Sequence, residues 1–279
     1  MTRRVLLFAH PAGHSLSPAM HNAALAALGI DARYEALDVP PAGLGAAVAA
    51  LRGPDVAGAN VTIPHKEAVV GWLDALTAAA REVGAVNTVM LEGGRLIGDN
   101  TDGEGFLHAL DELGVDPRGA ACVVLGAGGA ARAVTHALVR AGARVALHNR
   151  TAARAAALAA ALAGAGAGAG AVAVTDVDAL AAAVRSADLL VQATPAGMEG
   201  AAEGVSPLPA GLLPTAGAVV DLVYRPAETP LLAAAREAGL RAQNGLPMLV
   251  HQGALAFERW FGVAPPLDVM RRAARRALA

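Results

Sequence analysis

Lys66 is the residue of this chain whose type alone suggests chemistry. The 279 residues include 22 lysines and arginines, and every one of them except Lys66 is an arginine. Arginine keeps its proton at any pH that a protein meets, whereas lysine can be tuned to release one. A single lysine among so many arginines is therefore a candidate acid or base. The alternative interpretation is an ordinary solvated surface charge.

A candidate partner for Lys66 lies in the segment GDNTDGEGF, residues 98–106. Asp102 stands there just before a predicted helix, where a carboxylate commonly caps the helix N-terminus. The same carboxylate would also serve to orient an ammonium group and balance its charge. The sequence leaves both interpretations open.

Two serines form a candidate anion site in HSLSPAMHN, residues 14–22. Ser15 and Ser17 fall at a predicted turn from strand to helix, where hydroxyls beside a helix N-terminus can hold a small anion. The alternative for Ser17 is simple helix capping, with Pro18 as the first helical residue. No cysteine or paired acidic cluster accompanies the nearby histidines at ligand spacing, so we expect no metal site.

A glycine-rich loop, GAGGAA at residues 126–131, follows a predicted strand and opens a predicted helix. Gly126 permits the tight turn, Gly128 lets the backbone approach a pyrophosphate, and Ala131 allows close packing of the helix. The helix N-terminus adds attraction for phosphate charge. This context favours dinucleotide binding over a purely structural turn.

The segment HNRTAAR, about 20 residues beyond that loop, indicates which nicotinamide cofactor is bound. An NAD site would place Asp or Glu there to bond the ribose hydroxyls. This chain instead has Asn149, Arg150, Thr151 and Arg154. No carboxylate repels a 2′-phosphate, and two guanidiniums are available to pair with one. The sequence therefore predicts NADP(H). The alternative for Arg154 is an ordinary surface residue.

Composition limits the remaining classes of function. A net charge of −2 gives no electrostatic reason to expect a nucleic-acid partner. The lone Cys122 rules out an internal disulfide and fits a reducing compartment. The apolar run near the N-terminus is too short for a signal peptide, and the longest uncharged tract is rich in alanine and glycine. We expect a cytoplasmic protein with no membrane partner.

Apolar runs that alternate with helical patterns predict an α/β fold with mainly parallel sheets. In the first hundred residues we expect strands at RVLLFA, ARYEALDV and VAGANVTI, and a hairpin over AVNTVMLEGGRLIGDN. Lys66 falls at the opening of a helix. A second unit with the glycine loop has strands at ACVVL, ARVAL, ADLLVQAT and GAVVDLVY, and the chain ends in two helices. The Ala/Gly tract at 164–171 is interpreted as a flexible insertion between a helix and a strand.

Two domains follow from this pattern. Residues 1–101 with 245–279 form a predicted substrate domain, to which the C-terminal helices return, and residues 102–244 form a predicted Rossmann NADP-binding domain. We expect the active site in the cleft between them.

Several motifs together resemble the shikimate dehydrogenase family. They are HSLSPAMHN, NVTIPHK, GAVNT, GDNTDG, GAGGAAR, NRT, ATPAGM, DLVYRP and NGLPMLVHQG, and they follow the family's order over nearly the whole chain. The resemblance implies NADPH-dependent reduction of 3-dehydroshikimate to shikimate, in aromatic amino-acid and chorismate biosynthesis. It also implies that Lys66 and Asp102 are the catalytic pair.

The resemblance implies further roles. The substrate residues would be Ser15, Ser17, Asn60, Thr62, Asn87, Asp102, Tyr224 and Gln252. The cofactor residues would be Gly126, Ala127, Gly128, Gly129, Ala130, Asn149, Arg150, Thr151, Arg154, Thr194, Leu222 and Gly245. The two serines would hold the substrate carboxylate, and Leu222 and Gly245 would flank the nicotinamide.

Two alternatives stay open at this point. One is a quinate/shikimate dehydrogenase of dual specificity, and the other is a non-catalytic nucleotide-binding sensor on the same fold. The expected partner is a small-molecule substrate, and the chain is expected to be a monomer or a homodimer.

Overall fold

The structure is a computed structural model that describes residues 2–162 and 170–278. The chain divides into two compact units, Met1–Gly105 with Leu249–Ala279, and Phe106–Met248. Both boundaries fall inside helices, α4 (Asp102–Leu113) and α9 (Leu246–Phe261). Of the predicted Ala/Gly insertion at 164–171, residues 164–169 lie outside the described residues, and Gly170 and Ala171 begin a strand.

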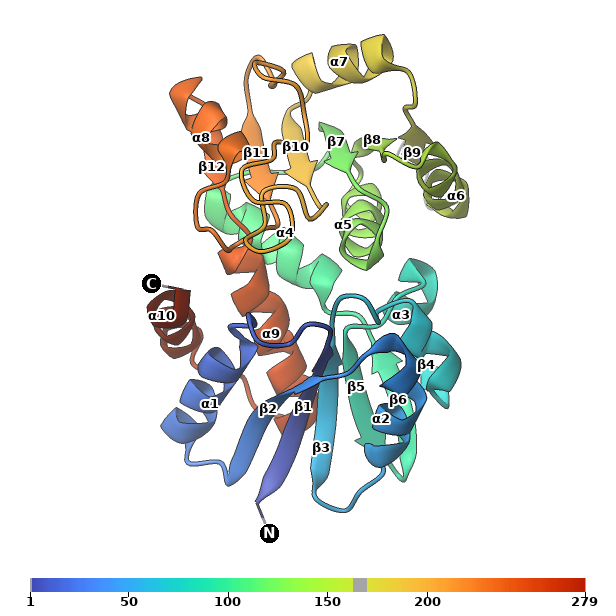
Figure 1. Cartoon of the computed structure of the whole chain (residues 1–279), viewed down its shortest axis with the longest axis vertical. Coiled ribbons are helices and arrows are strands. Elements are labelled where there is room, and N and C mark those ends of the chain that lie inside the picture. Colours follow the sequence, from blue (N-terminus) through green and yellow to red (C-terminus); the bar gives the residue numbers. More distant parts are fainter. Residues whose placement is uncertain (1, 163–169, 279) are drawn as a thin grey trace. The chain divides into compact units, whose positions relative to one another are not determined.

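Unit 1 contains a six-stranded sheet in the order β2-β1-β3-β5-β6-β4 (Figure 1). The strands are β1 (Arg3–Ala9), β2 (Ala32–Asp38), β3 (Val56–Val61), β4 (Ala75–Leu76), β5 (Thr88–Glu92) and β6 (Arg95–Asp99). Only β5 runs antiparallel to its neighbours. Gly93 and Gly94, both with positive φ, form the tight turn between β5 and β6. The predicted hairpin is confirmed.

Both faces of this sheet are covered, and alternate residues of β1 show it. Leu6 and Phe8 pack with residues of α2 (Leu44–Ala50) and η2 (Ala68–Trp72). Val5 and Leu7 pack on the other face with residues of α9. The remaining helical elements of unit 1 are α1 (Ser17–Leu28), η1 (Pro41–Gly43), α3 (Ala78–Val83) and α10 (Leu267–Leu278).

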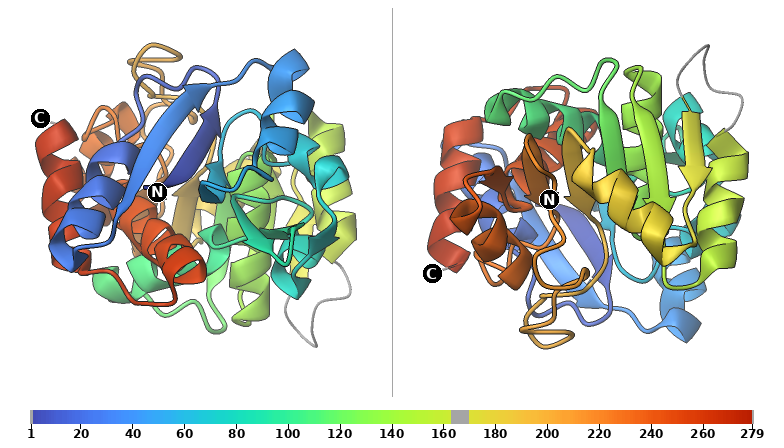
Figure 2. Two further views of the ribbon diagram at one scale, coloured as in Figure 1. Left: turned by 90° about the horizontal axis from the view of Figure 1, so that it is seen from below. Right: turned by 90° about the horizontal axis from the view of Figure 1, so that it is seen from above.

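Unit 2 contains six parallel strands in the order β12-β11-β10-β7-β8-β9. They are β7 (Ala121–Leu125), β8 (Arg144–His148), β9 (Gly170–Ala173), β10 (Leu189–Gln192), β11 (Ala218–Asp221) and β12 (Arg241–Gln243). One face packs on α4, α5 (Gly129–Arg140) and α6 (Ala152–Leu162), and the other on α7 (Val177–Arg185) and α8 (Pro230–Glu237) (Figure 2). This doubly wound arrangement confirms the predicted Rossmann-type unit.

Two local expectations were wrong. Ser17 is not the N-cap of α1, because the helix begins one residue earlier and Leu16 is the capping residue, without a side-chain bond. The hydroxyl of Ser15 instead accepts a hydrogen bond from the backbone N–H of Ser17, at 3.2 Å. Lys66 does not open an α-helix but lies in a turn before the short 3-10 helix η2. In the described part of the chain, no helix combines the length and hydropathy needed to cross a membrane.

A buried histidine stands at the centre of the aromatic cluster in unit 1. The ring of His21, on α1, stacks on Tyr34 with centroids 4.3 Å apart and an interplanar angle of 3°. Phe257 and Trp260 of α9 also lie beside it. Neither ring nitrogen has a hydrogen-bond partner among the described residues. Burial lowers the pKa of His21 to about 3, so the ring is neutral.

This histidine predicts a pH dependence of stability. Its pKa is 6.5 when exposed and about 3 when folded, so below pH 6.5 the unfolded chain binds a proton that the folded chain excludes. Stability is therefore lost as the pH falls, by about 2 kcal/mol from this group between pH 7 and pH 5. Urea unfolding at both pH values tests this with a His21→Phe variant, which lacks the titrating group. As the pH falls from 7 to 5, the free energy of unfolding of the variant, relative to that of the parent, should rise by this amount. A constant difference would contradict the prediction.

Candidate active site

The predicted catalytic and substrate residues of unit 1 gather at one edge of its sheet. Ser15 follows β1, Lys66 follows β3, and Asp102 follows β6, so all three lie beyond carboxyl ends. Asn87 immediately precedes β5. Because β5 runs antiparallel to β3 and β6, its amino end lies at the same edge. Residues from four separate segments are thus brought together.

Lys66 and Asp102 form a largely buried ion pair. The Lys66 Nζ lies 2.6 Å from Asp102 Oδ2, and the two side chains are 14% and 4% exposed. The Lys66 backbone is fixed by its carbonyl, which accepts a hydrogen bond from the N–H of Val86. Its neighbour His65 is buried, and its Nε2 donates to the carbonyl of Val39 at 2.6 Å. The turn that carries the lysine is therefore anchored on both sides.

The second oxygen of Asp102 is held by Asn87. The Asn87 Nδ2 donates to Asp102 Oδ1 at 2.9 Å, and it also lies within 2.9 Å of Thr101 Oγ1 and 3.1 Å of Gln252 Oε1. The Asn87 Oδ1 accepts from the backbone N–H of Thr101 at 2.9 Å. Each carboxylate oxygen of Asp102 therefore has a donor, which is what a buried charge requires.

Close packing of two helices brings Gln252 to this cluster. A Cβ added to Gly105 of α4 would lie 2.6 Å from the backbone nitrogen of Gln252 in α9, so no larger residue fits without a shift. The Thr101 hydroxyl also donates to the carbonyl of Gln252 at 3.0 Å. Gly105 thus permits the contact that brings Gln252 beside Asn87.

The other predicted substrate residues differ in how firmly the structure holds them. Asn60 is buried and uses its amide within the protein, whereas the half-buried Thr62 hydroxyl makes no hydrogen bond to any described residue. Ser17 is buried and Ser15 is half-buried at the start of α1. Tyr224 belongs to unit 2, where it follows β11.

The predicted cofactor residues of unit 2 lie at the carboxyl edge of its parallel sheet. They follow β7 (Gly126, Ala127, Gly128, Gly129, Ala130), β8 (Asn149, Arg150, Thr151, Arg154), β10 (Thr194), β11 (Leu222) and β12 (Gly245). Ligands of open parallel sheets bind outside this edge. The site residues therefore occupy the edge that a dinucleotide uses.

The loop after β7 fits a phosphate group. Gly126 has φ +117°, and a Cβ there would lie 2.9 Å from the carbonyl of Ala193, so the turn requires glycine. Gly128 caps α5 without a side-chain bond, and a Cβ at this position would meet nothing within 4 Å. The space beside the residue that caps α5 is therefore open, which suits an anion bound at the helix N-terminus.

The segment after β8 suits a 2′-phosphate. Arg150 is exposed, and Asn149 folds its side chain back so that Nδ2 donates to the carbonyl of Thr151 at 3.0 Å. The Arg154 guanidinium reaches the glycine loop, where its Nη2 lies 3.5 Å from the carbonyl of Ala127. This places one arginine beside the predicted phosphate loop, and Arg150 lies four residues earlier.

The turn after β11 is fixed by a buried carboxyl. Asp221 accepts hydrogen bonds from the N–H of Val223 at 3.0 Å and from the Thr229 hydroxyl at 2.7 Å. Burial raises the pKa of Asp221 to about 6. A Cβ on Gly245 would lie 2.0 Å from the carbonyl of Leu222, so Gly245 and Leu222 are in tight contact. The two residues predicted to flank the nicotinamide are neighbours.

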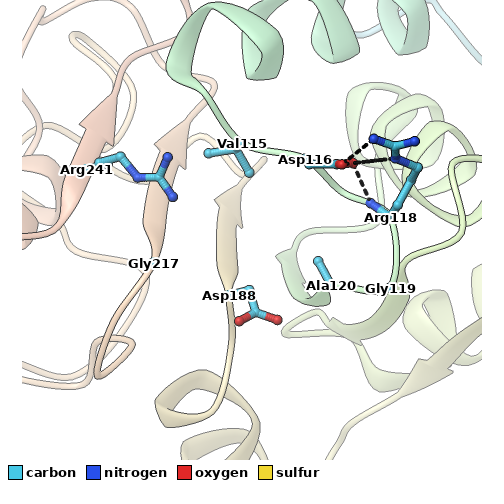
Figure 3. Close-up of a pocket in the computed structure, with 8 residues that line it drawn as sticks. All are labelled: Val115, Asp116, Arg118, Gly119, Ala120, Asp188, Gly217 and Arg241. Carbon is cyan, nitrogen blue, oxygen red and sulfur yellow. Dashed lines mark hydrogen bonds and ion pairs between the residues drawn. The ribbon is translucent and has the colours of Figure 1, made fainter.

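A cavity of about 320 Å³ lies at the opposite edge of this sheet (Figure 3). Its lining comes from residues that precede or begin β7, β10, β11 and β12: Val115, Asp116, Arg118, Gly119, Ala120, Asp188, Gly217 and Arg241. In Figure 3 the Arg118 guanidinium is paired with Asp116. Because these are the amino ends of the strands, the cavity is separate from the predicted cofactor site.

No group of three or more His, Cys, Asp or Glu residues in the described part of the chain is arranged to hold a metal ion. The single cysteine, Cys122, is buried in β7, and burial raises the pKa of its thiol to about 12. A buried thiol of this kind is a packing residue rather than a nucleophile.

Comparison with family models gives matches in both units. Residues 7–89 match the shikimate dehydrogenase substrate binding domain, and residues 245–275 match the shikimate 5′-dehydrogenase C-terminal domain. Residues 122–201 match the saccharopine dehydrogenase NADP binding domain.

Individual relatives cover the chain almost completely. It is 54% identical to the shikimate dehydrogenase (NADP(+)) of Symbiobacterium thermophilum. The alignment spans 274 residues and covers 98% of this chain and 93% of the relative. The crystal structure of shikimate 5-dehydrogenase from Thermus thermophilus, in complex with NADP(H) and shikimate, superposes with a TM-score of 0.89. The two sequences are 46% identical, and the superposition covers 99% of this chain and 100% of the crystallised one. Quinate dehydrogenase from Corynebacterium glutamicum with NAD gives a TM-score of 0.88, with 33% identity and 98% of each chain covered.

The contact at Gly105 generates a testable prediction. A Gly105→Ala substitution would force the backbone of α9 away from α4, and such overpacking costs about 1–3 kcal/mol. The free energy of unfolding, measured with urea, should fall by that amount. Gly71→Ala in η2 is the matched control, because its added Cβ meets nothing within 4 Å. Equal effects of the two substitutions would contradict the proposed close contact.

Proposed function

The chain belongs to the shikimate dehydrogenase family, and we propose that it catalyses the reversible NADPH-dependent reduction of 3-dehydroshikimate to shikimate. This reaction is a step of chorismate and aromatic amino-acid biosynthesis. The observation that carries the proposal is the buried contact between Lys66 and Asp102 beside Asn87 and Gln252.

The comparisons confirm the predicted class of enzyme and its cofactor. The chain is an oxidoreductase that uses NADP(H). When bound, NADP(H) donates or accepts the hydride. Support for its binding comes from the open N-terminus of α5, the required glycine at 126 and the absence of a carboxylate after β8.

Lys66 supplies the proton in the proposed mechanism. As hydride reaches the carbonyl carbon, negative charge develops on the oxygen, and the Lys66 ammonium stabilises it and donates a proton. In the oxidative direction the Lys66 amine accepts the proton from the substrate hydroxyl. Asp102 holds the Nζ at a fixed position through its 2.6 Å contact. A guanidinium at this position would keep the charge and lose the proton exchange.

The remaining side chains at this edge recognise the substrate. Ser15 and Ser17, with the N-terminus of α1, would bind the carboxylate. Ring hydroxyls would be bonded by Thr62, whose hydroxyl has no partner among the described residues, and by Asn87, Asp102 and Gln252. Asn60 would contribute indirectly, because its buried amide donates to the backbone carbonyl of Asn87. The family resemblance also assigns Tyr224, which lies in unit 2, to the substrate residues.

A quinate/shikimate dehydrogenase of dual specificity is the second candidate, favoured by the similarity to quinate dehydrogenase. The two functions are distinguished by comparing the rate with quinate and NAD to the rate with shikimate and NADP. Similar rates would favour dual specificity. A non-catalytic sensor would give a flat absorbance trace at 340 nm with shikimate and NADP while binding NADPH tightly. A cytoplasmic location and a monomer or homodimer remain predictions.

Replacing the lysine tests the mechanism. Lys66→Arg should lower kcat for shikimate oxidation by roughly 100-fold or more, because proton transfer by a positioned group contributes about 10²–10⁴-fold. Absorbance at 340 nm measures the rate at neutral pH. NADPH fluorescence titration is the control and should give an unchanged Kd. Turnover equal to that of the parent enzyme would refute the role of Lys66.

Removing an arginine tests the choice of cofactor. Arg150→Ala should raise KM for NADP about tenfold or more and leave KM for NAD unchanged, because only NADP carries the 2′-phosphate. Arg144→Ala is the matched control, since this exposed arginine begins β8 at the opposite edge of the sheet. An equal effect on both cofactors would show that Arg150 does not read the phosphate.

A further inference from the structure

A buried tyrosine is connected to the Lys66–Asp102 pair by hydrogen bonds within unit 1. We propose that Tyr34 is a positioning residue for this pair, acting through Asn60 and Asn87. The proposal rests on the function proposed above, because it assigns Tyr34 to the same reaction. Tyr34 is 2% exposed and lies on the edge strand β2.

Tyr34 is itself held by two adjacent residues of α1. His21 stacks on its ring with centroids 4.3 Å apart. Asn22 binds its backbone in both directions, since Oδ1 accepts from the Tyr34 N–H at 2.8 Å and Nδ2 donates to the Tyr34 carbonyl at 3.0 Å. With its ring and its backbone both fixed, the Tyr34 hydroxyl has a defined direction.

That hydroxyl donates to Asn60 Oδ1 at 2.8 Å. The Asn60 Nδ2 in turn donates to the carbonyl of Asn87 at 2.9 Å and lies 3.3 Å from Thr88 Oγ1. The Thr88 hydroxyl donates to Asn87 Oδ1 at 3.0 Å, and Asn87 Nδ2 donates to Asp102 Oδ1. A continuous path of hydrogen bonds therefore runs from Tyr34 to the catalytic carboxylate.

Backbone groups fix the direction of this path. The carbonyl of Asn87 can only accept, so the Asn60 atom that faces it must be Nδ2, and Asn60 Oδ1 must face Tyr34. The N–H of Thr101 can only donate, so Asn87 Oδ1 must face it and Asn87 Nδ2 must face Asp102. Neither amide can flip without leaving a buried group unpaired.

The Tyr34 hydroxyl is the donor that completes this arrangement. Asn60 is 5% exposed, and among the described residues its Oδ1 accepts a hydrogen bond from Tyr34 alone. Without that donor, a buried oxygen would be unsatisfied and Asn60 would gain by rotating away from Asn87. Asn87 would then be held less firmly. Because Asn87 binds the Asp102 carboxylate, the group that orients Lys66 would also be held less firmly.

The test is Tyr34→Phe, which removes the hydroxyl and keeps the ring. We expect kcat for shikimate oxidation to fall roughly three- to tenfold, the range for loss of one buried hydrogen bond, with KM for NADP unchanged. Val5→Ala is the control for packing, because Val5 pairs with Tyr34 in the sheet and shares its apolar cluster, while its side chain has no polar atom that could join the hydrogen-bond path. It should lower thermal stability while kcat stays within about 1.5-fold.

A double-mutant cycle separates positioning from a general loss of stability. In an Asn60→Ala background the Tyr34 hydroxyl has lost its acceptor, so adding Tyr34→Phe should change kcat by less than about 1.5-fold. An unchanged kcat in the single variant, or an equal loss of kcat in both backgrounds, would overturn the proposal. If the Asn60→Ala variant is too slow to measure, the kcat values of Tyr34→Phe and Val5→Ala are compared instead. A loss of kcat that is equal in these two variants would overturn the proposal.

The parent enzyme is assayed first with shikimate and NADP. No turnover by the parent would overturn the proposed function, and this inference with it. Turnover by the parent with no loss in Tyr34→Phe would overturn only the role of Tyr34.

Discussion

The buried carboxylate of Asp102 is the constraint on which the rest of unit 1 depends. A charged side chain that is only 4% exposed is unfavourable unless it is paired and hydrogen-bonded. Lys66 supplies the opposite charge to one oxygen and Asn87 supplies a donor to the other. Both partners must be held at hydrogen-bonding distance, so the segments that carry them must themselves be fixed. The bonds at His65, Val86 and Thr101 serve that purpose.

The reversal of one strand in the sheet makes this pairing compatible with the chain's connections. Lys66 follows β3, and Asp102 follows β6, with the tight hairpin β5–β6 between them in sequence. Because β5 runs back antiparallel, Asn87 enters the sheet at the edge where β3 and β6 end. A purely parallel sheet would need a crossover connection here and would not place Asn87 beside the ion pair.

Much of this arrangement could be predicted from the sequence, and particular elements show where prediction stopped. The strands with long apolar runs, the Gly-Gly hairpin and the glycine loop could be predicted because each has a distinctive local sequence pattern. The missed strands β4, β9 and β12 are short edge strands, formed by pairing with a neighbour rather than by their own periodicity. Helices α7 and α8 were also not predicted, although the sequence contains signals of their N-termini. These are the capping residues Asp176 and Thr229.

The candidate site shows the same limit. Residue type singled out Lys66, and the family motifs named its neighbours, but Tyr34 belongs to no motif that resembles a catalytic site. Its link to Asp102 passes through Asn60 and Asn87 and depends on which atom of each amide faces which backbone group. Such directions arise from tertiary hydrogen bonding and have no counterpart in local sequence.

The solitary lysine then follows from the geometry around it. At the other basic positions arginine suffices, because none of the roles assigned to them requires the loss of a proton. At position 66 the cation sits against one carboxylate oxygen while Asn87 occupies the other. The planar fork of arginine prefers to bind both oxygens of a carboxylate, so it would compete with Asn87 and would still be unable to exchange a proton. A single-point donor that can lose its proton satisfies both demands, and among the basic side chains that donor is lysine.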